Sequence, residues 1–251
     1  MVWQRDVETI RAERRPGDPQ AIAAIAADAD AGAAAREWIQ NAARLGYSYN
    51  FTWLGVPIIQ HPEDIVVVQE LIWQARPDLV IETGIAHGGS LLLSASILRL
   101  LGGDREVCGV DIDIRPHALE TLATHPLAES ITTIEGDSVS PEVFEQVRAV
   151  AERHERPLVI LDSNHTSQHV ADELRLYSEL VAVGSFLVVM DTVIRDLPAE
   201  VSSDRPWGPD DNPWTAVEAF LRSDRRFVPA PKVNEKLLAS GAPGGYLLRV
   251  G

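Results

Sequence analysis

The chain has 251 residues, of which 45% are apolar, 24% charged and 6% aromatic, a mixture typical of a globular protein. Its 22 basic and 37 acidic residues leave a net charge of −15, so it should repel nucleic acid and anionic membrane surfaces. One cysteine, Cys108, cannot form an internal disulfide, and the most apolar run, Leu180–Met190, is shorter than the about 20 residues of a membrane-spanning helix. No apolar signal-peptide core opens the chain, and we expect a soluble cytoplasmic protein.

The first 75 residues predict an N-terminal helical extension. Residues Ala21–Ala43 are rich in alanine, which orders into a helix at almost no cost. Their isoleucines are sparse, so this segment should pack as an arm; a partly disordered tail is the alternative for about the first 20 residues. The aromatic stretch Tyr47–Gln60 follows. Pro62 then begins a helix that we expect to run to about Ala75.

From Pro77 onward, short β-branched runs alternate with longer amphipathic segments. The expected strands are Leu79–Ile81, Val107–Val110, Ile131–Ile134, Leu158–Leu161, Phe186–Met190 and Tyr246–Val250. The expected helices are Ser90–Leu101, Pro116–Ala123, Pro141–His154, His169–Val183 and Trp214–Arg222, with a polar, proline-rich break at 198–213 before the last of them. This alternation predicts an α/β fold with a parallel sheet covered by helices on both faces.

Ligands of open α/β sheets bind at the carboxyl ends of the strands. The sequence after the first strand is Glu82-Thr-Gly-Ile-Ala-His-Gly-Gly-Ser90, in which Gly84 and Gly88 permit a tight turn and close backbone approach to a ligand. Ser90 is placed to cap the next helix. Asp111 ends the second strand, where an acidic side chain commonly accepts hydrogen bonds from ribose hydroxyls.

The turn after the third strand, Gly136-Asp137-Ser138, is placed to read an adenine amino group. With the glycine turn it predicts a cofactor that contains a nucleoside, the alternative being loop glycines beside surface carboxylates. A pyrophosphate needs bare amides at the helix start, whereas Glu82 would repel phosphate and favour an amine or sulfonium. Electrostatics therefore favours S-adenosylmethionine over NAD. His87 should line the cofactor pocket or lie on the loop surface.

Two aspartates end neighbouring strands, Asp162 the fourth and Asp191 the fifth. Adjacent strands lie about 4.8 Å apart, so both carboxylates could converge on one cation. Hard oxygen ligands suit Mg²⁺, with another divalent cation such as Mn²⁺ as the alternative. Thr192 could add a hydroxyl ligand or leave its place to water. Either aspartate could instead only cap the next helix.

His165 lies three residues after Asp162, so we expect it at the rim of the same site. Its imidazole could take a proton from a substrate hydroxyl, a role worth about 10²–10⁴-fold in rate. It could also ligate the metal directly, which would favour Mn²⁺, Fe²⁺ or Zn²⁺ over Mg²⁺, or be an inert residue at a helix start. His169 is expected on the face of a helix.

Three aromatic residues are candidates for stacking on the substrate. Trp207 lies in the irregular segment Arg205-Pro-Trp-Gly-Pro-Asp-Asp-Asn212, and Trp53 and Tyr49 lie in the earlier aromatic stretch. The alternative for each tryptophan is a place in the core.

Taken in order, these blocks resemble the cephalosporin hydroxylase/rhamnosyl O-methyltransferase family from about Phe51 to the C-terminus. The carriers are Trp53-Leu-Gly-Val-Pro57 with Gln60, Arg76–Ser90, Gly109–Arg115, Gly136–Ser138, Leu161–Thr166, and Arg205–Gly208 with Asp211–Pro213. The resemblance implies a Rossmann-like class I methyltransferase domain over residues 76–251, with a mostly parallel seven-stranded sheet, behind a helical extension or lid over residues 1–75. It also implies S-adenosylmethionine, usually a divalent metal, hydroxyl acceptors on natural products or sugars, and a homo-oligomer.

By similarity, Glu82, Gly84 and Ser90 would hold the methionine end, Asp111 the ribose, and Asp137 with Ser138 the adenine. The expected cofactor set also includes His87, Gly88, Ile112 and Asp162. Asp162 and Asp191 match metal-ligand positions, with Thr192 as a third candidate. Some relatives carry a second acid beside the equivalent of Asp191, where this chain has Met190 and Thr192. Catechol-type methyltransferases carry a catalytic lysine at the spacing that His165 occupies.

The sequence thus predicts a metal-dependent O-methyltransferase with Asp162 and His165 as catalytic residues. A substrate hydroxyl would displace a neutral thioether at the methyl carbon, the cation would lower the pKa of that hydroxyl, and His165 would accept its proton. The expected acceptor is a small molecule, a deoxysugar of the rhamnose type on a secondary metabolite. The alternatives are a hydroxylase of antibiotic biosynthesis, although no 2-His-1-carboxylate set can be placed, and a non-catalytic binding subunit.

Overall fold

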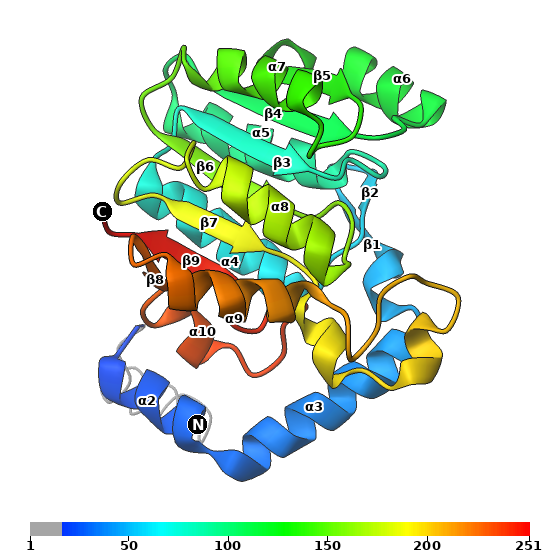
Figure 1. Ribbon diagram of the computed structural model, residues 1–251, viewed down its shortest axis with the longest axis vertical. Coiled ribbons are helices and arrows are strands. Elements are labelled where there is room, and N and C mark those ends of the chain that lie inside the picture. The colour runs from blue at the N-terminus through cyan, green and yellow to red at the C-terminus, as the bar shows by residue number, and fades with distance from the viewer. Residues whose placement is uncertain (1–16) are drawn as a thin grey trace, which may run out of the picture.

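A computed structural model describes residues 17–251 (Figure 1), so the first 16 residues of the predicted extension, which are most of the segment for which a disordered tail was the alternative, lie outside the described part. The central sheet has seven strands in the order β5-β4-β3-β6-β7-β9-β8. The strands are β3 (Leu79–Thr83), β4 (Glu106–Asp111), β5 (Ile131–Glu135), β6 (Pro157–Leu161), β7 (Phe186–Val189), β8 (Phe227–Pro229) and β9 (Tyr246–Arg249). β9 runs antiparallel to both of its neighbours and the other pairs are parallel, which confirms the predicted mostly parallel sheet.

Helices cover both faces of the sheet, as Figure 1 shows. One face packs against α4 (Pro62–Ala75), α5 (Gly89–Leu101) and α6 (Pro116–Thr124), and the other against α7 (Pro141–Ala151), α8 (Ser167–Tyr177) and α9 (Pro213–Ser223). Alternate residues of β3 divide between the two cores, with Val80 on the first side and Leu79 and Ile81 on the second. The chain order reverses beside β3, whose neighbours are β4 and β6, and this is where such sheets bind ligands.

The N-terminal segment forms an arm along one end of the molecule (Figure 1). It consists of α2 (Pro19–Ala27) and α3 (Ala29–Arg44), and α2 lies against α10 (Val233–Lys236). Asp28 separates the two helices and caps α3, because its carboxylate accepts a hydrogen bond of 2.9 Å from the backbone N–H of Ala31. The expected helical arm is thus present as two helices.

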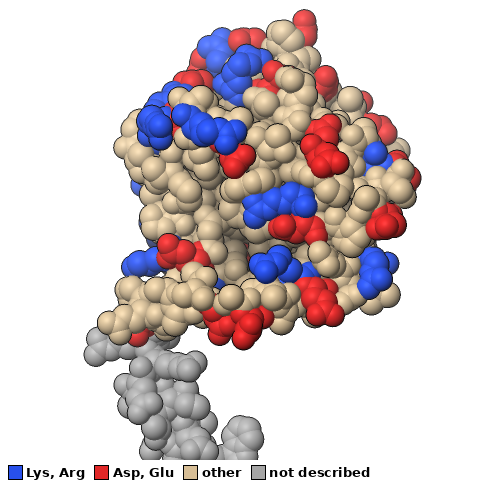
Figure 2. All heavy atoms as spheres, turned by 60° about the horizontal axis from the view of Figure 1, so that its bottom comes forward, with Lys and Arg blue, Asp and Glu red and all other residues tan. Residues whose placement is uncertain are grey.

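Between the arm and α4 the chain forms the 3₁₀ helix η1 (Tyr47–Asn50) and a hairpin of β1 (Phe51–Trp53) and β2 (Val56–Ile58). Short 3₁₀ turns also occur at η2 (Ala128–Ser130), η3 (Thr192–Asp196) and η4 (Ala199–Ser202). α4 precedes residue 76, yet Val67, Leu71 and Ile72 on its inner side belong to the core of the sheet. Figure 2 shows Lys and Arg side chains next to Asp and Glu side chains in several places on this end of the molecule, with other residues between them.

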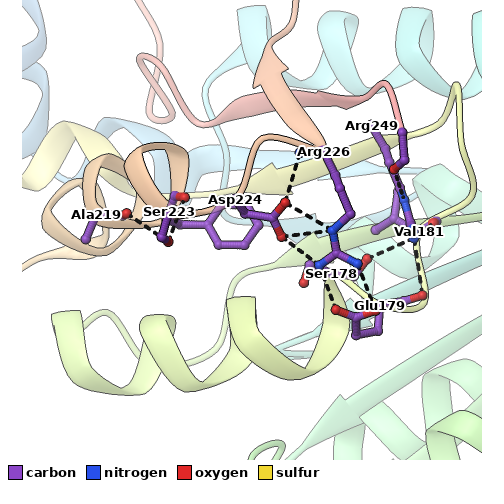
Figure 3. A network of polar contacts seen from close by, with 10 residues as sticks. Ser178, Glu179, Val181, Ala219, Ser223, Asp224, Arg226 and Arg249 are labelled. Carbon is purple, nitrogen blue, oxygen red and sulfur yellow. Dashed lines mark hydrogen bonds and ion pairs between the residues drawn. The ribbon is translucent and has the colours of Figure 1, made fainter.

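A polar network closes the antiparallel edge of the sheet, away from the carboxyl ends of β3 and β6. Figure 3 shows Arg226 between Asp224 and Glu179, to both of which its guanidinium donates hydrogen bonds. Arg249 donates to the backbone carbonyls of Ser178 and Glu179, both at 3.3 Å, at the end of α8. These contacts join α8, α9 and β9, although such exposed ion pairs contribute only about 0–1 kcal/mol each.

Candidate active site

The turn after β3 is held by close backbone packing. Gly84 has a left-handed φ of 89°, and a Cβ at this position would lie 2.0 Å from the carbonyl oxygen of Asp162. Only glycine fits there, because β3 and β6 pair side by side immediately before these residues. Gly88 also has a left-handed φ, of 90°, and forms the N-cap of α5.

A cavity of about 420 Å³ lies at the ends of β3, β4, β5 and β6, and we call it the strand-end cavity. Six residues of the predicted cofactor set line it: Gly84, Asp111, Ile112, Asp137, Ser138 and Asp162. The Asp111 carboxylate also accepts hydrogen bonds from the backbone N–H groups of Ile85 and Ala86, at 2.7 and 3.2 Å. This contact fastens the glycine turn to the end of β4, a role that the sequence did not indicate.

Glu82 is buried at the end of β3, with an exposed fraction of 1%. The Ser90 hydroxyl donates to its Oε1, while Oε2 has no hydrogen-bond partner among the described residues. The prediction that Ser90 caps α5 is wrong, because the helix begins at Gly89 with Gly88 as its N-cap and the Ser90 side chain is engaged by Glu82. Burial raises the pKa of Glu82 to about 7.

This raised pKa predicts that the ligand-free protein loses stability with rising pH. The folded state holds the Glu82 proton up to about pH 7, whereas the unfolded carboxyl releases it near 4.5. Glu82 should therefore lower the free energy of unfolding by about 3 kcal/mol across this interval, and Glu82→Gln should remove that contribution. Urea unfolding of the wild type and of Glu82→Gln, each below pH 4.5 and above pH 7, measures this contribution. The same change of unfolding free energy with pH in both proteins would contradict a buried, ionisable carboxyl at residue 82.

His169 lies on α8, as expected, and its side chain also belongs to a polar network that the sequence analysis did not predict. Its Nε2 lies 3.1 Å from Ser138 Oγ, 3.2 Å from Ser163 Oγ and 3.5 Å from Glu173 Oε1. The hydrogen bond with Glu173 raises the pKa of His169, and the ring lines the strand-end cavity. The i, i+4 spacing of His169 and Glu173 was a sequence signal for this pair.

Asp162, His165 and Asp191 come together beyond the ends of β6 and β7. One ligand atom from each lies within 4.8 Å of those of the other two. His165 Nε2 is 3.0 Å from Asp191 Oδ2. Burial, followed by the charges of Asp191 and Glu82, raises the pKa of Asp162, so the cluster favours the approach of positive charge. Two carboxylates and one imidazole form a donor set that could hold a divalent cation.

Thr192 does not share in this cluster, contrary to its place among the predicted metal ligands. Asp191 adopts a left-handed conformation with a φ of 55°, and the chain turns at once into η3. The Thr192 side chain is consequently buried, and its hydroxyl donates a hydrogen bond of 3.0 Å to the carbonyl of Pro243. It therefore faces the C-terminal loop and away from the two carboxylates.

A second cavity, of about 580 Å³, lies beside the cluster, and we call it the arm cavity because Ile39 and Ala43 of α3 line it. Asp162, His165 and Asp191 line it as well. Three further groups that the sequence singled out also line it: His87, Tyr49 and Trp207. The cavity thus sets the predicted cation ligands opposite side chains of the N-terminal arm.

The tryptophans differ in their surroundings. Trp207 lines both cavities, and its ring meets that of His165 edge to face with centroids 4.8 Å apart. Trp53 packs against the core, and its indole N–H donates a hydrogen bond of 3.1 Å to Ser96, so substrate stacking by Trp53 is not supported. His87 lines the arm cavity and a small neighbouring one, and its Nδ1 lies 2.9 Å from Nε2 of His117, a residue that lines neither.

Asp64 links α4 to the C-terminal loop that contacts the turn at Asp191. No sequence pattern indicated this role. Its buried carboxylate accepts hydrogen bonds from the hydroxyls of Ser240 and Tyr246, both at 2.5 Å, and from the backbone N–H of Gly241 at 2.6 Å. The Gly241 carbonyl in turn accepts from the N–H of Val193 at 3.1 Å. α4, the C-terminal loop and η3 are thereby joined beneath Asp191.

Comparison with solved structures identifies the fold. A structure of CmcI with magnesium and S-adenosylmethionine matches 81% of this chain and 78% of that protein, with a TM-score of 0.57 at 20% identity. An O-methyltransferase from Bacillus cereus in complex with S-adenosylhomocysteine matches 78% of this chain and 81% of that protein, with a TM-score of 0.52 at 13% identity. The chain has the Rossmann-like fold of these methyltransferases.

Comparison with sequences identifies the family. A rhamnosyl O-methyltransferase of Mycobacterium leprae (strain TN) is 31% identical over 200 residues, which cover 79% of this chain and 82% of that protein. Another from Mycobacterium bovis (strain BCG) is 30% identical over 200 residues, with 79% and 78% covered. The Rhamnosyl O-methyltransferase/CmcI family profile matches residues 45–250. Its sequence and its fold together place this chain in the rhamnosyl O-methyltransferase/CmcI family.

Proposed function

We propose that this chain is an S-adenosylmethionine-dependent O-methyltransferase that methylates a hydroxyl group of a sugar-bearing natural product, with a divalent cation held by Asp162 and Asp191. The convergence of these two carboxylates with His165 is the observation that carries the proposal. Asp162 lines both the strand-end cavity and the arm cavity, so this cluster lies where ligands in the two cavities would meet.

The surroundings of the strand-end cavity fit S-adenosylmethionine. Glu82 Oε2 is a buried acceptor without a partner, which suits the ammonium group of the methionine end. In the proposed arrangement Glu82, Gly84 and Ser90 hold that end, Asp111 the ribose, and Ile112, Asp137 and Ser138 the adenine. The family relationship supports the same cofactor.

The cluster itself fits Mg²⁺ or Mn²⁺. Neighbouring carboxylates and burial disfavour the ionised form of Asp162, and a bound cation would offset this repulsion. Among the described residues the cluster offers one histidine and two carboxylates, whereas the iron centre of many hydroxylases uses two histidines and one carboxylate. The donor set therefore supports the methyltransferase over the hydroxylase alternative.

When bound, S-adenosylmethionine supplies an electrophilic methyl group and the cation supplies positive charge that favours the ionised form of the acceptor hydroxyl. Asp191 and the edge of the Trp207 ring orient the imidazole of His165. The contact of Asp191 with Nε2 favours a proton on that nitrogen and leaves Nδ1 to accept the hydroxyl proton. The walls of the arm cavity orient the acceptor and exclude water, which lowers the entropic part of the barrier.

The acceptor in this proposal is a deoxysugar of the rhamnose type on a small metabolite. Trp207 and Tyr49 give the arm cavity two aromatic side chains that can pack on the apolar face of a sugar ring. The relatives are named rhamnosyl O-methyltransferases, which supports the same class.

Incubation of the protein with S-adenosylmethionine, Mg²⁺ and a panel of rhamnosides with their matched aglycones tests the function. We expect mass spectrometry to show one added methyl group on a rhamnoside, none on its aglycone, and none when a chelator is present. Methylation of the aglycone alone would contradict the sugar acceptor. Full activity in chelator would contradict the role of the cation.

We also propose a cytoplasmic homo-oligomer. The only cysteine, Cys108, is buried and its thiol pKa is raised to about 12, which suits a protein without disulfides. Leu45 and Leu54 expose 83% and 57% of their surface near the arm, which favours a contact between copies. Light scattering tests the oligomeric state, and a monomer mass at micromolar concentration would contradict the homo-oligomer.

None of the described helices is long and apolar enough to cross a membrane.

A further inference from the structure

A small cavity of about 40 Å³ shares wall residues with both larger ones, and we call it the junction cavity. It shares Gly84 and Ala86 with the strand-end cavity, Gln60 and His87 with the arm cavity, and Asp162 with both. Its volume suits a charged head group and not a ring. Ser90, which holds Glu82, lines it as well.

Gln60 has a buried amide that the described part of the protein leaves unpaired. Its side chain is 5% exposed, and its Oε1 has no hydrogen-bond partner among the described residues. A buried amide oxygen without a partner costs about 1–3 kcal/mol, so its presence on a cavity wall indicates a ligand that would satisfy it. Gln60 was neither among the residues expected at the strand ends nor in the predicted cofactor set.

Close packing fixes Gln60 against the glycine turn. A Cβ on Gly89 would lie 2.3 Å from the carbonyl oxygen of Pro57, so β2 and the start of α5 are in direct backbone contact. The chain then runs from Pro57 to Gln60 along the wall of the junction cavity. Rigid backbone on both sides therefore holds the amide at this wall.

The charge around the junction cavity favours a cationic group. Glu82 Oε2 is a second buried oxygen without a partner, and Asp162 is a further carboxyl on the cavity wall. Gln60 Oε1 thus belongs to a residue of the cavity wall, and Glu82 lies behind that wall, bonded to the wall residue Ser90; the space itself has the size of one ammonium group. An ammonium offers three N–H donors, which matches acceptors that have no donor of their own.

We propose that Gln60 binds the amino-acid end of S-adenosylmethionine. Its Oε1 accepts a hydrogen bond from the α-ammonium group. The inference rests on the proposed function and assigns to Gln60 the recognition of the one part of the cofactor that is an amino acid. The rival role for Gln60, contact with the acceptor molecule, is an outcome of the test.

Titration calorimetry with two adenosine ligands tests the proposal. S-adenosylhomocysteine carries the amino-acid end, and 5′-methylthioadenosine lacks it. We expect Gln60→Leu to weaken S-adenosylhomocysteine about 10-fold and to leave the affinity for 5′-methylthioadenosine unchanged. Gln74 is an exposed glutamine of α4 that lines none of the three cavities, and Gln74→Leu should change neither affinity.

A second variant separates binding from structure. Gln60→Glu keeps an acceptor oxygen and adds charge that attracts an ammonium, so its affinity for S-adenosylhomocysteine should stay at or above that of the wild type. Equal loss of both ligands in Gln60→Leu would show a damaged site and overturn the proposal. Unchanged binding of both, with a raised KM for the acceptor, would assign Gln60 to the acceptor and also overturn it. If the wild type binds neither ligand, the proposed function itself fails.

Discussion

Alanine in place of Asp191 is expected to lower kcat for methyl transfer by about 10³-fold, because the positive charge held by the two carboxylates is worth several kcal/mol in the transition state. The same change removes the partner of His165 Nε2. Affinity for S-adenosylhomocysteine should stay within about 3-fold, since Asp191 does not line the strand-end cavity. Steady-state turnover with added Mg²⁺ and titration calorimetry measure the two effects.

Asp204→Ala is the matched control for this variant. Asp204 also lines the arm cavity, but its side chain is 80% exposed and it is not in the cluster of Asp162, His165 and Asp191. Its turnover should remain close to that of the wild type. If Asp191→Ala kept full turnover, or if Asp204→Ala lost as much, the role of Asp191 would be refuted.

Gly84→Ala is expected to give the largest loss of stability. The new Cβ would lie 2.0 Å from the Asp162 carbonyl oxygen, and both atoms belong to backbone fixed by the pairing of β3 with β6. Neither strand can move without breaking the sheet, so we expect the free energy of unfolding to fall by more than about 4 kcal/mol. Thermal unfolding should show a Tm lower by about 10 °C or more, or the variant should be insoluble.

Gly103→Ala separates this collision from backbone strain. Gly103 has a similar left-handed φ of 81°, but a Cβ there would have no atom within 4 Å. Its replacement should cost only about 1–2 kcal/mol, the penalty of a left-handed conformation. Similar losses in both variants would show that the close approach of β3 and β6 does not restrict residue 84.

The sequence predicted most where the order of apolar runs determines which residues lie at the ends of the parallel strands. Alternating β-branched runs predicted the parallel strands, and the residues that follow them, such as Asp111 and Asp162, line one cavity because parallel strands end at the same edge. The edge strand β8 was missed because three residues, Phe227–Pro229, carry no measurable periodicity. The hairpin of β1 and β2 was missed for the same reason.

Side-chain roles were predictable only where backbone position determines them. Ser90 follows a glycine turn as a cap would, yet the buried Glu82 competes for its hydroxyl. Thr192 adjoins Asp191 in sequence but the left-handed turn directs it elsewhere. Asp64 meets Ser240 across 176 positions, a contact that only the folded chain reveals.

Binding of Mn²⁺, followed by electron paramagnetic resonance in the presence of S-adenosylhomocysteine, tests most directly whether Asp162 and Asp191 share a cation. The wild type should bind one Mn²⁺ per chain and release it to excess Mg²⁺, while Asp162→Asn and Asp191→Asn should each bind it far more weakly with S-adenosylhomocysteine still bound. A wild type that leaves Mn²⁺ free in solution, or aspartate variants that bind it as tightly as the wild type, would contradict the account.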